Sequence, residues 1–70
     1  MKIPKNETLR VTYKAHGLPV FLLTEDRAKN TFVLYEPTED GVKKLGKAAS
    51  PIELEEKFGV LERIAEEAKH

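Results

Sequence analysis

The sequence lacks cysteine and tryptophan and carries no formal net charge. Without cysteine the chain forms no disulfide and offers no thiolate ligand for a metal ion, so neither can reinforce a small core. Its 12 Lys and Arg side chains are balanced by 12 Asp and Glu side chains. The overall charge therefore gives no reason to expect a polyanionic partner.

Long apolar runs are also absent. The longest, such as residues 20–23, contain four apolar residues, whereas a membrane-spanning helix needs about 20. Residues 1–7 include basic side chains but no apolar stretch follows them, as it would in a secretory signal peptide. We therefore expect no membrane association and a cytoplasmic protein.

The length allows one small domain, residues 1–70. Leu, Ile, Val and Phe number 19 of the 70 residues, above the level of roughly 20% below which chains usually stay disordered. A core of this size supplies only about 3–5 kcal/mol. We expect a folded domain that depends on close packing or on association with another chain.

The clearest strand pattern covers residues 8–14, where apolar and polar side chains alternate strictly. Leu9, Val11 and Tyr13 share one face, which is typical of a half-buried strand. Further strands are predicted at 20–24, at 31–36 and, more weakly, at 42–45. The segments that connect them are rich in Gly, Pro, Asn and Asp, the residues that favour turns.

A helix start is the sharpest local signal. Ser50 fits the N-cap, Pro51 fits the first helical position, and Glu53 completes a capping box. At 100° per residue, the apolar side chains that follow gather on one side of a helix over 51–69. These side chains are Leu54, Phe58, Leu61, Ala65 and Ala68. Gly59 lies on the opposite side, and a break there into two short helices is the alternative.

These elements predict an α+β domain, with a three- or four-stranded antiparallel β-meander followed by one C-terminal amphipathic helix packed on one sheet face. Residues 1–50 carry a net charge of +3 and residues 51–70 a net charge of −3. An acidic helix is therefore expected beside a basic sheet. The acidic side of the helix, with Glu55, Glu62 and Glu66, is a candidate for contact with a basic partner surface.

Patterns for catalysis or metal binding are not found. A nucleophile needs a neighbouring base, but Ser50 is already assigned to the helix cap, and neither His16 nor His70 has an evident partner. The acidic pairs at 25–26 and 39–40 lack the spacing of a calcium loop. We therefore expect no enzyme, no cofactor, no metal site and no small-molecule substrate.

One apparent motif is rejected. Residues 41–48 fit the phosphate-binding pattern G-x-x-x-x-G-K, but Ala48 stands where Ser or Thr would hold magnesium. The motif also requires a helix that starts at once, so that free amides face the phosphates. The helix predicted here starts later, at Ser50.

The predicted strands at 20–24 and 31–36 are apolar on both faces, yet one helix covers only one face of a sheet. Strands of this kind are normally covered on both faces. The first interpretation is that the uncovered face binds a second copy of the chain or another protein. Its candidate anchors are Phe21, Leu23, Val33 and Tyr35. The second interpretation is that the sheet curls and that residues 3–4 and 45–49 shield the face.

The sequence therefore predicts a small non-enzymatic protein-protein interaction module. Small neutral chains without catalytic motifs are common among phage and mobile-element accessory proteins. The alternative is a nucleic-acid-binding protein, in which basic side chains on a sheet face and at its edge contact phosphates. The candidate residues for that contact are Arg10, Lys14, Lys43, Lys44 and Lys47.

Overall fold

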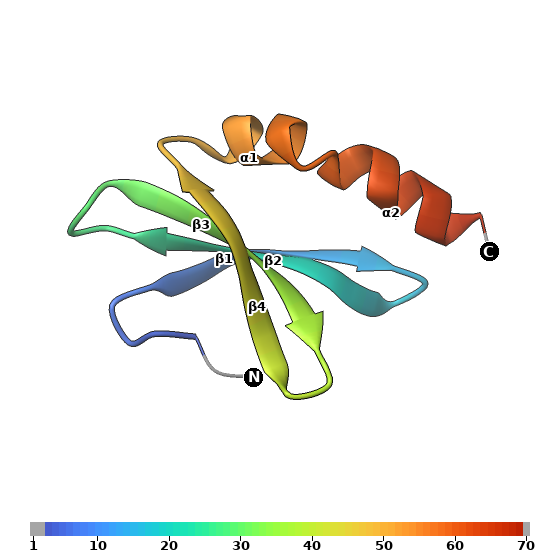
Figure 1. The fold of residues 1–70 in the computed structure, drawn as a ribbon, viewed down its shortest axis with the longest axis horizontal. Helices are drawn as coiled ribbons and strands as arrows, with labels where there is room; N and C mark the ends of the chain where they lie inside the picture. The colour runs from blue at the N-terminus through green and yellow to red at the C-terminus, as the bar shows by residue number, and fades with distance from the viewer. Residues whose placement is uncertain (1–2, 70) are drawn as a thin grey trace.

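A four-stranded antiparallel sheet followed by two short helices makes up the fold (Figure 1). The computed structural model describes residues 3–69. The strands lie in the sheet in chain order, β1-β2-β3-β4, and the predicted α+β meander is confirmed. The bounds are β1 Thr8–Ala15, β2 Leu18–Asp26, β3 Thr31–Thr38, β4 Gly41–Ala48, α1 Pro51–Lys57 and α2 Val60–Ala68.

The strands extend further than their sequence patterns indicated because the turns are tight. His16 and Gly17 join β1 to β2 with φ angles of 54° and 77°. Two successive residues with positive φ are typical of the type I′ turn, whose twist matches that of the flanking strands. Residues 39–40 join β3 to β4. Pro19 and Pro37, both expected in turns, therefore lie within strands.

The helical segment starts as predicted but is divided in two. Ser50 is the N-cap of α1, and its Oγ accepts a hydrogen bond from the Glu53 amide at 3.4 Å. The single helix expected over 51–69 ends at Phe58, because Gly59 adopts a left-handed conformation with a φ of 58°. Glycine takes this conformation without steric cost. The alternative, a break at Gly59, is the one observed.

The break changes which side of the second helix faces the sheet. In a continuous helix, Leu61, Ala65 and Ala68 would lie on the same side as Leu54. In the structure Val60 is fully buried instead, and Leu61 is 60% exposed. Ala65 and Ala68 are exposed as well. The helix α2 therefore presents an apolar stripe to solvent.

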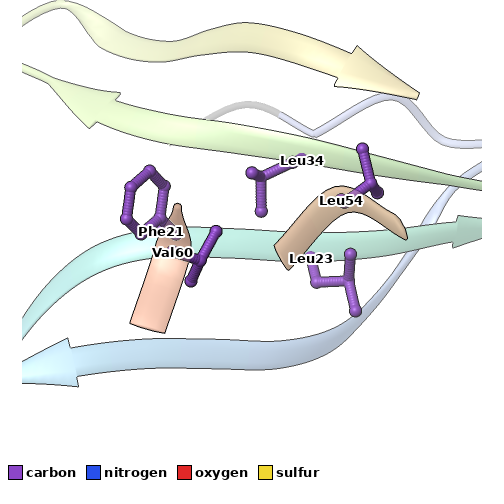
Figure 2. Packing of buried hydrophobic residues seen from close by; sticks show 5 residues of the cluster. All are labelled: Phe21, Leu23, Leu34, Leu54 and Val60. Carbon is purple, nitrogen blue, oxygen red and sulfur yellow. The ribbon is translucent and has the colours of Figure 1, made fainter. Parts of the chain in front are cut away.

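The main core lies between the sheet and the two helices (Figure 2). Leu23 and Leu34 lie opposite each other on β2 and β3, and Leu54 of α1 packs against them. Val60 of α2 packs beside Phe21. Because all five side chains are buried, each contributes on the order of 1.5–3 kcal/mol relative to an exposed position.

Phe58, at the junction between α1 and α2, lies very close to Gly46 of β4. A Cβ atom on Gly46 would lie 2.7 Å from Cζ of Phe58, well inside van der Waals contact. We expect Gly46→Ala to lower the free energy of unfolding by about 1–3 kcal/mol, the usual effect of overpacking. Urea denaturation measures this loss.

The matched control makes the same change in a Phe58→Leu background. The smaller side chain removes the aromatic ring from the clash, so Gly46→Ala is expected to destabilise this background much less. A double-mutant cycle isolates the coupling between the two positions. Equal losses in the two backgrounds would contradict the contact.

Candidate functional site

The four predicted anchors do not form an exposed surface. Phe21 and Leu23 belong to the core beneath the helices, and Val33 and Tyr35 lie on the opposite face of the sheet. Each of the four is at most 5% exposed. The expectation that these side chains face a partner is therefore wrong, because the chain covers both faces of its central strands itself.

The second face is closed by the segment that precedes β1. Glu7 Oε1 accepts hydrogen bonds from the hydroxyls of Tyr35 and Thr24, both at 2.6 Å. Asn6 donates a hydrogen bond to Asp26 Oδ2 at 2.9 Å. The second interpretation, in which the chain itself covers this face, is the one observed. The hydrogen bonds that attach the covering segment to the sheet come from Asn6 and Glu7.

Beneath this segment lies a second, smaller core. Leu22, Val33 and Tyr35 form it, and Val42 packs against it. These side chains come from β2, β3 and β4, in a sheet that is strongly twisted (Figure 1). The segment 45–49, expected to help here, contributes instead to the core beneath the helices.

The basic residues of the nucleic-acid alternative lie on two strands that do not pair with each other. Two lie on β1 and three on β4, the two opposite edges of the sheet: Arg10, Lys14, Lys43, Lys44 and Lys47. Cross-strand pairing turns Lys44 and Lys47 to the face away from the helices and Lys43 toward them. Arg10 Nε lies 3.5 Å from a carboxylate oxygen of Glu25. The five residues are therefore divided between the two edges of the sheet, and their contact with nucleic acid stays a prediction.

A hollow of about 280 Å³ lies between the β1–β2 turn and α2. Its charged side chains contact one another, since Arg63 lies 3.1 Å from Glu36 and 3.5 Å from Glu67. His16 Nε2 donates a hydrogen bond to the Glu67 backbone oxygen at 3.0 Å, which satisfies a carbonyl at the end of α2. None of the described residues that line the hollow carries a hydroxyl or a thiol. These contacts hold α2 on the sheet.

The remaining sequence patterns and site types, a phosphate-binding loop, a metal site and a membrane-spanning helix, are compared with the structure in turn. The segment Gly41–Ala48, which partly fits a phosphate-binding loop, forms β4, so it does not lead directly into a helix N-terminus. Within residues 3–69, no three His, Asp or Glu side chains gather as a metal site would require. His70 lies outside the described residues. Neither α1 nor α2 has the length and apolarity needed to cross a membrane.

Exposed apolar side chains do occur at one open strand edge. Among residues 3–69, β1 pairs with β2 alone, so its other side is open to another strand. Val11 is 41% exposed and lies opposite Leu23, on the helix side of the sheet. Leu9 is also exposed and lies opposite Thr24, on the other side.

Leu61 of α2 points toward the same edge. Positions 61 and 63 of a helix are about 200° apart. Arg63 turns inward over the sheet, because it contacts Glu36 on β3 and its Cζ lies 5.6 Å from the ring centre of Phe21 on β2. Leu61 therefore faces the opposite way, past β1, which α2 contacts. We call Val11, Leu61, Ala65 and Ala68 the edge surface.

Sequence reasoning missed the edge surface because it treated residues 51–69 as one helix. In that helix Leu61 belonged to the packing side. The signal that could have revealed it was Gly59, since a left-handed residue there rotates everything that follows relative to α1. Val11 was placed correctly on the helix side of the first strand, but its position at an edge leaves it partly exposed. The expectation that Leu9 shares this face is wrong, because the pairing of β1 with β2 shifts between Leu9 and Val11.

Comparisons with known proteins identify no relative, since no protein-family model, no curated protein and no solved structure matches the chain. The functional argument therefore depends on the arrangement of the chain's own residues.

The Glu7 carboxylate is expected to be important for stability. Glu7→Ala removes the acceptor of two hydroxyls, one of them on the fully buried Thr24. We expect a loss of about 1–3 kcal/mol in the free energy of unfolding, the usual effect of an unsatisfied buried donor. Glu7→Gln keeps a carbonyl acceptor and is expected to lose less. Urea denaturation of both variants measures this, and equal losses would contradict the role of the acceptor.

Two tyrosine hydroxyls are hard to ionise in the folded chain. Burial, followed by the hydrogen bond to Glu55 at 2.6 Å and its charge, raises the pKa of Tyr13. Burial, followed by the hydrogen bond to Glu7 and its charge, raises the pKa of Tyr35. The associated stabilisation is fully present below the ordinary tyrosine pKa of about 10. It is lost as the pH rises through the raised values, because the unfolded chain releases these protons first.

We therefore expect the urea midpoint to fall as the pH rises above about 10. Tyr13→Phe and Tyr35→Phe each remove one of the two ionising groups, so each is expected to reduce the slope of this fall relative to the variant's own value near neutral pH. A series of urea titrations at alkaline pH measures the slopes. A wild-type midpoint that stays constant through that range would contradict the expectation.

Proposed function

We propose that this protein is a small non-enzymatic protein-protein interaction module that binds its partner through the edge surface. The observation that carries the proposal is the open edge of β1, with the exposed side chains of Val11 and Leu61 beside it. An edge strand accepts another strand through main-chain hydrogen bonds. Apolar side chains next to it add affinity when the partner buries them.

The position of α2 supports strand addition as the mode of binding. A strand added to β1 would lie beneath the flank of α2 that carries Leu61, Ala65 and Ala68. Its side chains on the helix side would contact this apolar flank, while its backbone pairs with β1. An extended segment beside a sheet edge is a recurrent mode of peptide recognition, in which main-chain pairing supplies affinity and side-chain contacts supply specificity.

Apolar complementarity is expected to dominate over charge at this surface. Arg10 lies near Glu25, and Arg63 contacts Glu36 and Glu67, so the arginines near β1 and α2 already have carboxylate partners. Contact with nucleic acid is the alternative function, and the cross-linking experiment below distinguishes the two. The cytoplasmic location and the absence of catalysis stay predictions.

A photo-reactive benzoyl-phenylalanine in place of Leu61 tests the proposal, with the same group in place of Ile52 as the matched control. Ile52 is 65% exposed and Leu61 60% exposed, but Ile52 belongs to α1, which packs over β3 and β4. Irradiation in the cells that naturally produce the protein is expected to yield protein adducts from position 61 and few from position 52.

Equal yields of protein adducts at the two positions would contradict the edge surface as the binding site. Adducts with nucleic acid in place of protein would favour the alternative function. A salt series separates the two functions further. Binding dominated by phosphate contacts weakens steeply between about 50 and 200 mM salt, as counterions are released, whereas apolar binding is expected to change little.

A further inference from the structure

We infer that a small hollow on the face of the sheet away from the helices binds a phosphate group. The hollow has a volume of about 80 Å³ and lies between the β2–β3 turn, β4 and the segment that precedes β1. Its charged lining residues are Lys29, Lys44, Lys47, Glu7 and Asp26. We call it the lysine hollow. It shares no residue with the edge surface, so the inference goes beyond the proposed function.

The three lysines come from two parts of the chain that the sheet brings together. Lys44 lies opposite Tyr35 and Lys47 opposite Val33, so both leave β4 on the face that carries the smaller core. Lys29 belongs to the β2–β3 turn, from which β3 runs directly alongside the end of β4. An edge strand and an earlier turn therefore present basic side chains to one hollow.

A β-bulge in β4 puts Lys44 and Lys47 on the same face. Residues three positions apart lie on opposite faces of a regular strand, because successive side chains alternate. Here the pairing with β3 passes from Gly46 directly to Lys44, which leaves Leu45 as the extra residue. Bulges re-aim side chains in this way and are frequent beside functional sites.

The ammonium groups at the lysine hollow have no protein partner in the described part of the chain. The ion pairs between residues 3–69 all involve arginine side chains. The side-chain hydrogen bonds over the same range use no lysine ammonium. Positive charges around one small hollow repel one another, and a bound anion offsets this repulsion.

The two carboxylates at the lysine hollow are held by other donors. Glu7 Oε1 accepts two hydroxyls from β2 and β3. Asp26 accepts the Asn6 side-chain amide at 2.9 Å and the Lys29 backbone amide at 3.3 Å. Three ammonium groups and two carboxylates leave a formal net charge of +1 at the lysine hollow. This balance favours a small anion over a cation.

A phosphate group suits the lysine hollow in size and in hydrogen bonding. A volume of about 80 Å³ exceeds the roughly 30 Å³ that one water occupies in the liquid. It is far below the roughly 300–1,000 Å³ of pockets for drug-sized ligands. Phosphate oxygens accept hydrogen bonds, and lysine ammonium groups donate them. Because these oxygens point in several directions, one phosphate group can meet three separate ammonium groups, whereas a carboxylate offers two oxygens.

Titration with inorganic phosphate at constant ionic strength, followed by amide chemical shifts, tests the site. Saturable shifts are expected around the lysine hollow, with a dissociation constant on the order of 1–10 mM, because each exposed ion pair contributes little. Sodium chloride at the same ionic strength is the control and is expected to produce no saturable shift.

Three single variants test the role of the lysines. Lys44→Gln and Lys47→Gln are each expected to raise the dissociation constant for phosphate about two- to fivefold, the usual effect of removing one exposed ion pair. Lys43→Gln is the matched control, because Lys43 is an exposed residue of the same strand that turns toward the helices. It is expected to leave the dissociation constant unchanged. Circular dichroism checks that all three variants keep the fold.

A second titration distinguishes two sources of the phosphate group. A short single-stranded DNA without a terminal phosphate offers backbone phosphates only. If these are the source, the DNA binds more tightly than inorganic phosphate, and its affinity falls in Lys44→Gln and not in Lys43→Gln. Binding of inorganic phosphate without binding of this DNA assigns the lysine hollow to a free phosphate or a phosphate monoester.

Three outcomes overturn the inference. The first is the absence of saturable shifts with either inorganic phosphate or the DNA. The second is an equal response to chloride, which would indicate general ionic screening. The third is an equal change of affinity in Lys43→Gln and Lys44→Gln, which would remove the lysine hollow as the binding site. None of these outcomes bears on the edge surface, because the two sites use different residues.

Discussion

Two-sided burial of β2 and β3 is the constraint on which the rest of this structure depends. Both strands are apolar on both faces, and the residues after the sheet form one helical layer, which covers one face only. The other face is closed by the twist of the sheet and by Glu7, whose carboxylate bridges Tyr35 and Thr24. A buried hydroxyl without an acceptor would cost about 1–3 kcal/mol, so this bridge makes the second core possible. Within residues 3–69, the exposed large apolar side chains therefore lie outside the central parts of β2 and β3.

The left-handed conformation of Gly59 both completes the main core and creates the edge surface. Gly59 in the left-handed conformation ends α1 and redirects the chain, so that Leu54 and Val60 reach the core from two different helices. The turn also leaves Phe58 against the backbone of Gly46. Redirection of α2 moves Leu61 out of the packing side and places it above the open edge of β1. Core packing and interaction surface are thus consequences of one backbone conformation.

Local patterns predicted the elements well, and the candidate site poorly. Strict alternation identified β1, and the Ser50 cap with Pro51 identified the start of α1, because both signals depend on near neighbours in the chain. The anchors Phe21, Leu23, Val33 and Tyr35 were misplaced because alternation tells which side chains share a face and not what covers that face. The basic residues separated because a meander in chain order puts β1 and β4 at opposite edges. That separation was already implicit in the predicted topology.

By itself, the sequence determined the meander of strands followed by a helical segment, the start of that segment and the absence of cysteine. Tertiary structure alone decided which apolar side chains stay exposed. The physical reason is that burial depends on contacts between residues far apart in the chain, such as Tyr35 with Glu7 and Tyr13 with Glu55, which are 28 and 42 positions apart. Propensity and periodicity describe neighbours a few residues apart. They therefore predicted the strands and the helical segment, while the exposed flank of β1 and α2 emerged only when those elements packed together.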